Sequence, residues 1–263
     1  MELSLKDKSV LVTGGNRGIG LAIALAFADE GANVAICGRD KVALAAAKSE
    51  IKARNVKAHT IAADLFTAEG CERAVLETTD AFGGLNVLVS NASTNIGGTL
   101  ESLTDDQAIE RVMGKTLAAM RLSRVALPHL RDAGGGRIIC IGGTAARTPG
   151  KTSLPSGLGN SSLVNFVKHF SNDVGPDNIT VNVVHPPFTK TDRYPARLQA
   201  RAEQLNVSLE EAEASFVADF PIGRIVEPVD IAPMVLFLAS PQAAAVTGQA
   251  VAIDGGSSQI ITY

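Results

Sequence analysis

The chain has 263 residues and a formal net charge of −3, from 24 Lys and Arg against 27 Asp and Glu side chains. This balance gives no reason to expect nucleic acid as a partner, and without a membrane-spanning apolar stretch or a signal-peptide core the expected location is the cytoplasm. The hydrophobic fraction of 46%, few aromatic residues and no Trp suit parallel strands covered by helices, which predicts one α/β domain over residues 1–263.

The first predicted element is a strand at residues 9–12, followed at once by a glycine-rich turn and a helix over about residues 18–30. Apolar side chains recur at helical spacing after the turn. Gly14, Gly18 and Gly20 let the backbone approach a pyrophosphate, whose charge then lies against the first amides of the helix. This order of strand, turn and helix predicts a dinucleotide site.

The rest of the chain repeats the alternation of strand and helix. Further strands are expected near residues 33–37, 59–63, 86–90, 137–141, 179–184 and 250–253. The pattern predicts a doubly wound (Rossmann) fold with seven parallel strands and helices on both faces. The three cysteines, Cys37, Cys71 and Cys140, are interpreted as small core residues rather than disulfide partners or ligands, and no metal site is expected.

The glycine spacing of the first turn, with Thr13 in front, resembles that of the short-chain dehydrogenase/reductase family. The resemblance continues at Asp64, 90–93, 137–141, 181–186, Thr191, 223–224, Pro228, 237–240, 247–248 and 254–256. It implies a cofactor site at Gly14, Asn16, Arg17, Gly18, Ile19, Gly20, Arg39, Asp64, Leu65, Asn91, Ala92, Pro186 and Thr191. It also implies a homo-oligomer, a tetramer rather than a dimer, with the apolar run 260–263 buried against a neighbouring subunit.

A charged, helix-prone segment at about 189–219 interrupts the alternation. It occupies the position of the family's substrate-covering loop. One interpretation is a solvated helical excursion and the other is a mobile lid over the pocket, and the two are compatible. Its position in the fold favours the lid.

The end of the second strand distinguishes NAD from NADP. NAD sites place a carboxylate there to accept hydrogen bonds from the ribose, whereas a 2′-phosphate needs positive charge. This chain has Gly38 and Arg39 at that point, and Arg17 in the glycine turn lies within reach of the same phosphate in family members that carry it. Guanidinium–phosphate pairing therefore favours NADP(H), although Asp40 could pair with Arg39 and weaken the effect.

The residues that the family uses for proton transfer are absent. The family has a Tyr, a Lys four residues later, a Ser thirteen residues before the Tyr and an Asn on an earlier helix. The alignment puts these positions, in the same order, at Ser156, Asn160, Gly143 and Lys115. The only tyrosines, Tyr194 and Tyr263, are not followed by a Lys at this spacing, so no realignment restores the motif.

Other side chains could supply chemistry at the altered site. Ser156 can hydrogen-bond a carbonyl but is a poor proton donor, because its hydroxyl is far less acidic than a phenol. Lys115 could enter the space vacated at Asn160 and stabilise an alkoxide, or it could extend to solvent or to a phosphate. Thr144 offers a further hydroxyl, and His185 is a candidate general acid.

Three functions from different classes follow. The first is an NADP(H)-dependent oxidoreductase that acts on a carbonyl or alcohol of a small molecule with a non-standard proton relay. The second is a non-catalytic NADP-binding subunit or sensor, and the third is a lyase or isomerase that reuses the pocket. The intact cofactor motifs favour the first, while the identity of the substrate is not readable from the pocket segments.

Overall fold

Seven parallel strands form one sheet in the order β3-β2-β1-β4-β5-β6-β7 in the computed structural model, which describes residues 2–94 and 97–260. The strands are β1 (Ser9–Thr13), β2 (Asn33–Gly38), β3 (Ala58–Ala62), β4 (Val87–Ser90), β5 (Gly136–Ile141), β6 (Ile179–His185) and β7 (Ala250–Ala252). This order confirms the doubly wound fold predicted from the sequence.

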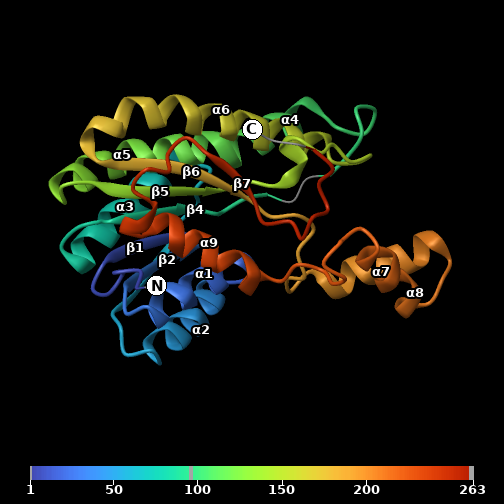
Figure 1. Ribbon diagram of the computed structural model, residues 1–263, viewed down its shortest axis with the longest axis horizontal. Helices are drawn as coiled ribbons and strands as arrows, with labels where there is room; N and C mark the ends of the chain where they lie inside the picture. Colours follow the sequence, from blue (N-terminus) through green and yellow to red (C-terminus); the bar gives the residue numbers. More distant parts are fainter. Residues whose placement is uncertain (1, 95–96, 261–263) are drawn as a thin grey trace.

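Helices cover both faces of the sheet (Figure 1). They are α1 (Gly18–Asp29), α2 (Lys41–Lys52), α3 (Ala68–Phe82), α4 (Asp105–Val112), α5 (Ala118–Asp132), α6 (Leu154–Val174), α7 (Tyr194–Leu205), α8 (Leu209–Val217) and α9 (Pro228–Ala239). Helices α1, α2 and α9 pack on one face, and α3, α5 and α6 pack on the other. Val10 and Val12 of β1 contribute to the first core and Leu11 to the second, as the two-residue period of a strand requires.

The strand order reverses between β1 and β4, which are neighbours in the sheet. Loops that leave neighbouring parallel strands on opposite sides of such a point enclose a crevice at the carboxyl edge. The glycine turn follows β1, and the loop that carries Asn91 follows β4. The fold therefore brings these two segments together at the predicted dinucleotide site.

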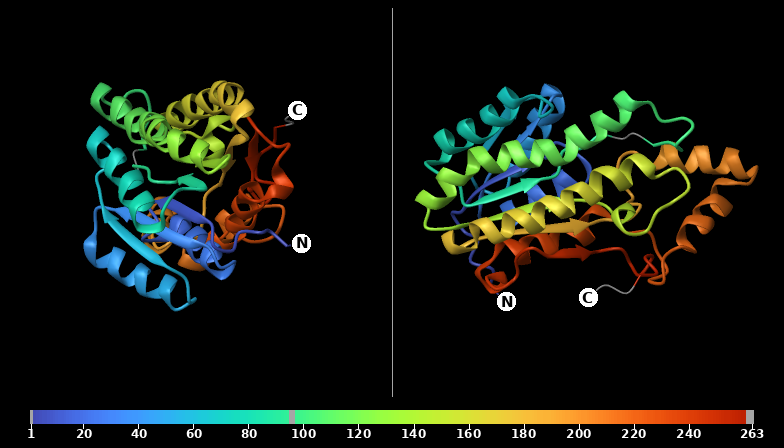
Figure 2. Two further views of the ribbon diagram at one scale, coloured as in Figure 1. Left: turned by 90° about the vertical axis from the view of Figure 1, so that its left-hand side faces the viewer. Right: turned by 90° about the horizontal axis from the view of Figure 1, so that it is seen from above.

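Helices α7 and α8 occupy the segment that interrupts the alternation, and they project beyond the sheet (Figure 1 and the right view of Figure 2). The rings of Phe188 and Phe216 stack with centroids 4.5 Å apart. Tyr194 is only 6% exposed, and its hydroxyl donates to Glu213 Oε1 at 2.9 Å. Tyr194 thus packs within the α7–α8 segment and does not face the cavity.

A π-helical turn, Met113–Leu117, joins α4 to α5 and was not expected from the sequence. Gly114 in this turn lies against the ring of Phe66, where an added Cβ would come within 2.5 Å of a ring carbon. Such insertions into a helix often occur at functional sites. Here the turn carries Lys115.

Three further expectations from the sequence concern the cysteines, membrane-spanning helices and the C-terminal residues. Cys37, Cys71 and Cys140 are buried and free, which confirms their interpretation as core residues. Within residues 2–94 and 97–260, no helix is long and apolar enough to cross a membrane. Residues 261–263, which include Tyr263 and most of the run predicted to contact a neighbouring subunit, lie outside the described residues.

Candidate cofactor site and active site

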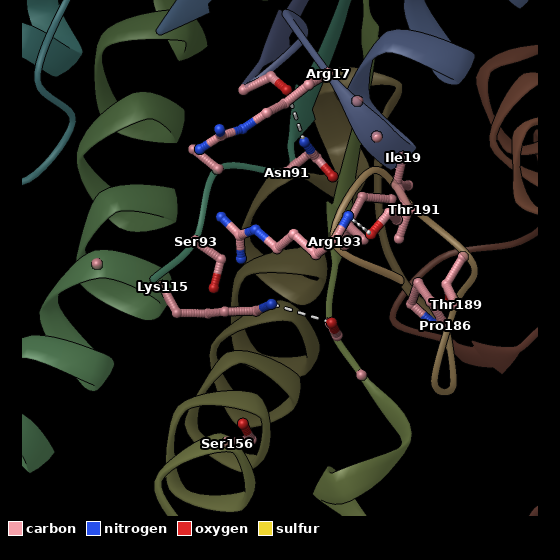
Figure 3. A pocket seen from close by; sticks show the side chains of 18 of the residues that line it. Arg17, Ile19, Asn91, Ser93, Lys115, Ser156, Pro186, Thr189, Thr191 and Arg193 are labelled. Carbon is pink, nitrogen blue, oxygen red and sulfur yellow. Dashed lines mark hydrogen bonds between the residues drawn. The ribbon is translucent and has the colours of Figure 1, made fainter. Parts of the chain in front are cut away.

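A cavity of about 970 Å³ opens at the carboxyl edge of the sheet. Of the residues predicted from the sequence for cofactor binding and catalysis, all but His185 line this one cavity, from the glycine turn to Ser156 and Asn160. Figure 3 shows Arg17, Asn91, Lys115 and Ser156 in it. The α7–α8 segment contributes Arg193 and Arg197 to its wall. The structure therefore brings the two predicted groups of residues together.

The glycine turn after β1 leaves the start of α1 open. Gly14 and Gly18 have φ angles of +64° and +54°, which side-chain-bearing residues rarely adopt. Arg17 is the N-cap, and neither a side-chain cap nor an acidic residue in the first turn satisfies the helix amides. Free amides and the positive end of a helix dipole form an anion site, so this turn fits a diphosphate.

Thr13 and Asn91 fasten the ends of β1 and β4 to each other. The Thr13 hydroxyl accepts hydrogen bonds from the amides of Asn91 at 2.8 Å and Ala92 at 3.1 Å. The Asn91 side-chain amide donates to the Thr13 carbonyl at 2.9 Å. These bonds hold the two walls of the crevice at a fixed separation.

The carboxylate of Asp40 does not pair with Arg39. Its Oδ1 caps α2 by accepting from the amides of Val42 and Ala43 at 3.0 and 3.1 Å. Arg17 and Arg39 are exposed and line the cavity at this end. Their positive charge is therefore free to meet a 2′-phosphate, which removes the sequence-based objection raised by Asp40.

Lys115 is buried at the opposite end of the cavity, with only 7% of its surface exposed. Its Nζ donates to the Gly142 carbonyl at 3.0 Å, at the end of β5 (Figure 3). Burial, and next the charge of Arg111, lower the pKa of this ammonium to about 7. Lys115 thus does not extend to solvent, and it can exchange a proton near neutral pH.

His185 is held in one neutral form beside this lysine. Its Nδ1 accepts a hydrogen bond from the Gly143 amide at 2.9 Å, so the ring proton lies on Nε2. Burial, and next the charge of Lys115, lower the His185 pKa to about 4. A neutral imidazole is a poor general acid, which disfavours the role considered for it from the sequence.

Asn160 fills the space next to Gly143. A Cβ added to Gly143 would lie 2.7 Å from Asn160 Nδ2, too close for a side chain unless Asn160 moves. Asn160 Oδ1 is buried and has no partner among the residues that the structure covers. The glycine at 143 and the asparagine at 160 are therefore sterically matched.

A family model described as enoyl-(acyl carrier protein) reductase matches residues 14–258. The chain belongs to the short-chain dehydrogenase/reductase family.

Relatives and solved structures agree with this assignment. The NADPH-dependent reductase BacG of Bacillus subtilis (strain 168) is 29% identical, over 98% of this chain and 100% of that protein. A dehydrogenase/reductase from Sinorhizobium meliloti 1021 is 39% identical, with a TM-score of 0.86 and 97% of each chain covered. L-Sorbose reductase from Gluconobacter frateurii, complexed with NADPH and L-sorbose, has a TM-score of 0.95 at 29% identity, covering 99% of this chain and 100% of the other.

Sequence reasoning missed one prominent residue of this short-chain dehydrogenase/reductase. Arg111 lines the cavity, is 7% exposed, and donates from Nη1 to Ser93 Oγ at 2.6 Å and from Nη2 to Ser156 Oγ at 3.3 Å. It stands four residues before Lys115, a spacing that places two side chains on one face of a helix. This spacing could have indicated from the sequence that Arg111 lies beside Lys115.

Proposed function

We propose that this short-chain dehydrogenase/reductase uses NADP(H) to interconvert a small-molecule carbonyl and alcohol, with the Lys115 ammonium supplying the proton that the family takes from a tyrosine. The observation that carries the proposal is the position of Lys115, buried in the same cavity as the glycine turn with a pKa of about 7. A general acid works best when its pKa lies near the operating pH.

Two parts of the nucleotide, the diphosphate and the 2′-phosphate, support the assignment to NADP(H). The uncapped start of α1 suits the diphosphate, and Arg17 with Arg39 suits the 2′-phosphate. The structurally similar sorbose reductase is a complex with NADPH, and BacG is described as NADPH-dependent. When bound, the reduced nicotinamide supplies the two electrons and the hydrogen that reach the carbonyl carbon.

The chain's own residues supply the proton and the orientation. Lys115 Nζ stabilises negative charge on the substrate oxygen and transfers one proton to it, which leaves a neutral amine that regains a proton from water. The hydroxyl of Thr144 lines the cavity and orients the same oxygen, while that of Ser156 orients another part of the substrate. The Asn160 side chain fills the space that a side chain at position 143 would occupy.

Nucleotide binding and carbonyl reduction test the proposal separately. We expect the purified protein to bind NADPH more tightly than NADH, and to oxidise NADPH when a suitable carbonyl from a panel is added. Lys115→Met should retain NADPH affinity but lose about 10²–10⁴-fold in turnover. Unchanged turnover in this variant would rule out Lys115 as the acid.

Other outcomes separate the alternatives. Failure to bind either nucleotide would refute the cofactor assignment. Tight NADPH binding without oxidation by any carbonyl would support a nucleotide-binding subunit or sensor. Conversion of a substrate in the absence of nucleotide would support a lyase or isomerase.

We also propose that the protein acts in the cytoplasm as a homo-oligomer, a tetramer rather than a dimer, in line with the usual assembly of the family. Apolar side chains exposed on the helices of one face support an interface there, including Ile109 of α4 at 58% and Leu158 of α6 at 45% exposure. Light scattering on the purified protein should give a mass four times that of the chain. A monomer mass would contradict this assembly.

A further inference from the structure

Two cations lie side by side along one helix face in the candidate active site. Arg111 ends in the cavity from α4, Lys115 reaches it from the π-helical turn, and each is 7% exposed. Arg111 Nη1 donates to Ser93 Oγ and to the Thr94 carbonyl, while its Nη2 donates to Ser156 Oγ. Lys115 donates to a backbone carbonyl. Every one of these partners is neutral.

The positive charge of this pair is not balanced by the protein. Across residues 2–94 and 97–260, no Asp or Glu forms an ion pair with either cation. The acidic residues of the cavity wall are Asp40, Asp64 and Asp192, and all three are exposed. Buried charge without a counter-ion is costly, and a bound anion would remove that cost.

Hydrogen-bond donors remain available beside Arg111. Both hydrogens of Nη1 are donated, to Ser93 and Thr94, but Nη2 donates only one of its two, to Ser156. The Ser156 hydroxyl accepts that bond and donates none to a described residue. The Nε–H of Arg111 is buried without a partner as well, so two N–H groups and one O–H remain. A guanidinium with two unpaired N–H groups suits the planar pair of oxygens of a carboxylate.

We infer that the substrate is a carbonyl compound that also carries a carboxylate, with the carboxylate bound at Arg111 and Ser156 and the carbonyl oxygen at Lys115. This inference rests on the proposed reductase function and specifies the substrate class of the same site. Figure 3 shows Ser93, Lys115 and Ser156 around one part of the cavity, away from Arg17 and the glycine turn. The anion site is therefore separate from the region that fits the cofactor phosphates.

Matched pairs of compounds test the carboxylate directly. The probes are the 2-oxo, 3-oxo and 4-oxo acids 2-oxobutyrate, acetoacetate and levulinate, each with its methyl ester, assayed as kcat/KM with NADPH. We expect at least one acid to exceed its ester by about 30-fold or more, since removing one partner of a buried charge pair typically costs that much. Equal and measurable rates of reduction for every acid and its ester would overturn the inference but leave the reductase proposal intact.

Variants locate the effect at Arg111. In Arg111→Met we expect the preference for acid over ester to disappear, and in Arg111→Lys, which retains the charge, to persist in part. Arg124→Met is the matched control, because Arg124 is exposed on α5 and is absent from the cavity wall; it should keep the full preference. Thermal unfolding of each variant reports whether the fold is retained, and an acid preference that persists in folded Arg111→Met would contradict the site.

A binding measurement in the unmodified protein does not depend on any variant or on turnover. The NADPH complex is titrated with 2-hydroxybutyrate, 3-hydroxybutyrate and 4-hydroxyvalerate while the Lys115 side chain is followed by NMR with labelled lysine. A bound carboxylate should raise the Lys115 pKa above 7 against the opposing effect of Arg111, with Cys140 and His185 as the other titratable neighbours. No binding and no shift would overturn the inference. Binding with a shift, but without reduction of any oxo acid, would retain the anion site and refute the reductase proposal.

Discussion

The Lys115 side chain carries the chemistry that distinguishes this site. A lysine in water keeps its proton to pH 10.5, whereas burial and the nearby Arg111 bring the pKa of Lys115 to about 7. Its Nζ has one protein acceptor, the Gly142 carbonyl, so an ammonium there has hydrogens left for a ligand. The lowered pKa makes the proton available, and it also costs folding stability.

The stability cost predicts a specific pH dependence. Between pH 7 and 10.5 the unfolded chain holds the Lys115 proton and the folded chain does not, so unfolding takes up a proton and stability rises with pH. The free energy of unfolding of the wild type relative to Lys115→Met should therefore rise by about 1.4 kcal/mol per pH unit within this window, and stay level below pH 7.

Urea denaturation of both proteins across pH 6–10 measures this difference. Folding lowers the pKa of His185 to about 4 and raises that of Cys140 to about 12, but both residues are present in both proteins, so their contributions cancel in the difference to first order. Parallel stability curves would show that Lys115 keeps an ordinary pKa in the folded chain.

The steric match between Gly143 and Asn160 can be tested by replacing each residue. Gly143→Ser should destabilise the protein by about 1–3 kcal/mol, because the new Cβ would lie 2.7 Å from Asn160 Nδ2. Asn160→Ala in the same chain should relieve most of that cost, which denaturation of the two single variants and the double variant measures as a coupling energy. Gly175→Ser is the control, since nothing lies within 4 Å of its added Cβ. Strictly additive effects at 143 and 160 would contradict the contact.

At the scale of elements, helix ends and one helix interruption define the cavity. The start of α1 is left uncapped at the cofactor end, and Asp40 is committed to capping α2. The π-helical turn places Lys115 against the end of β5. These local departures from regular helix position the charges on both sides of the cavity.

The α7–α8 segment is expected to open independently of the sheet, as a lid requires. Phe216 stacks on Phe188 and lies 5.7 Å from the Arg201 guanidinium, so Phe216→Ala removes the centre of this packing. Hydrogen exchange in α7 and α8 should accelerate in this variant, while β1–β6 remain protected. Phe82→Ala, at the end of α3 on the other side of the sheet, should leave α7 and α8 unchanged. Faster exchange throughout the sheet in Phe216→Ala would argue against a separate lid.

In the molecule as a whole, the cavity wall is positively charged although the net charge of the chain is negative. The chain is acidic, at −3, yet the described cavity wall carries six cationic side chains and three carboxylates. The cations are Arg17, Arg39, Arg111, Lys115, Arg193 and Arg197. A local excess of positive charge attracts anionic ligands to a protein whose remaining surface repels them.

This distribution predicts how salt acts on the cofactor. Raising the sodium chloride concentration should weaken NADPH binding more steeply than NADH binding, because only NADPH carries the 2′-phosphate that meets Arg17 and Arg39. Fluorescence titrations of both nucleotides at several salt concentrations give the two slopes. Equal slopes would mean that these arginines do not bind the phosphate.

Local sequence patterns predicted the positions of the strands, but not the burial and charge effects that arise between residues distant in the sequence. Each strand ends within one residue of its expected place, because apolar runs and glycine turns are short-range signals. The alignment with the family also predicted that Gly143, Ser156 and Asn160 share one site with Lys115, and all four line the same cavity. The sequence could not show that Arg111 turns inward, that a π-helical turn interrupts the helix, or that these together change the Lys115 pKa, since burial depends on distant elements.

The most direct test of Lys115 as the proton source is the pH dependence of kcat/KM for carbonyl reduction at saturating NADPH. The wild type should decline as pH rises through about 7, since the ammonium is the active form, and Lys115→Met should be slower and lack this decline. A variant that keeps both the wild-type rate and the wild-type profile would contradict the assignment.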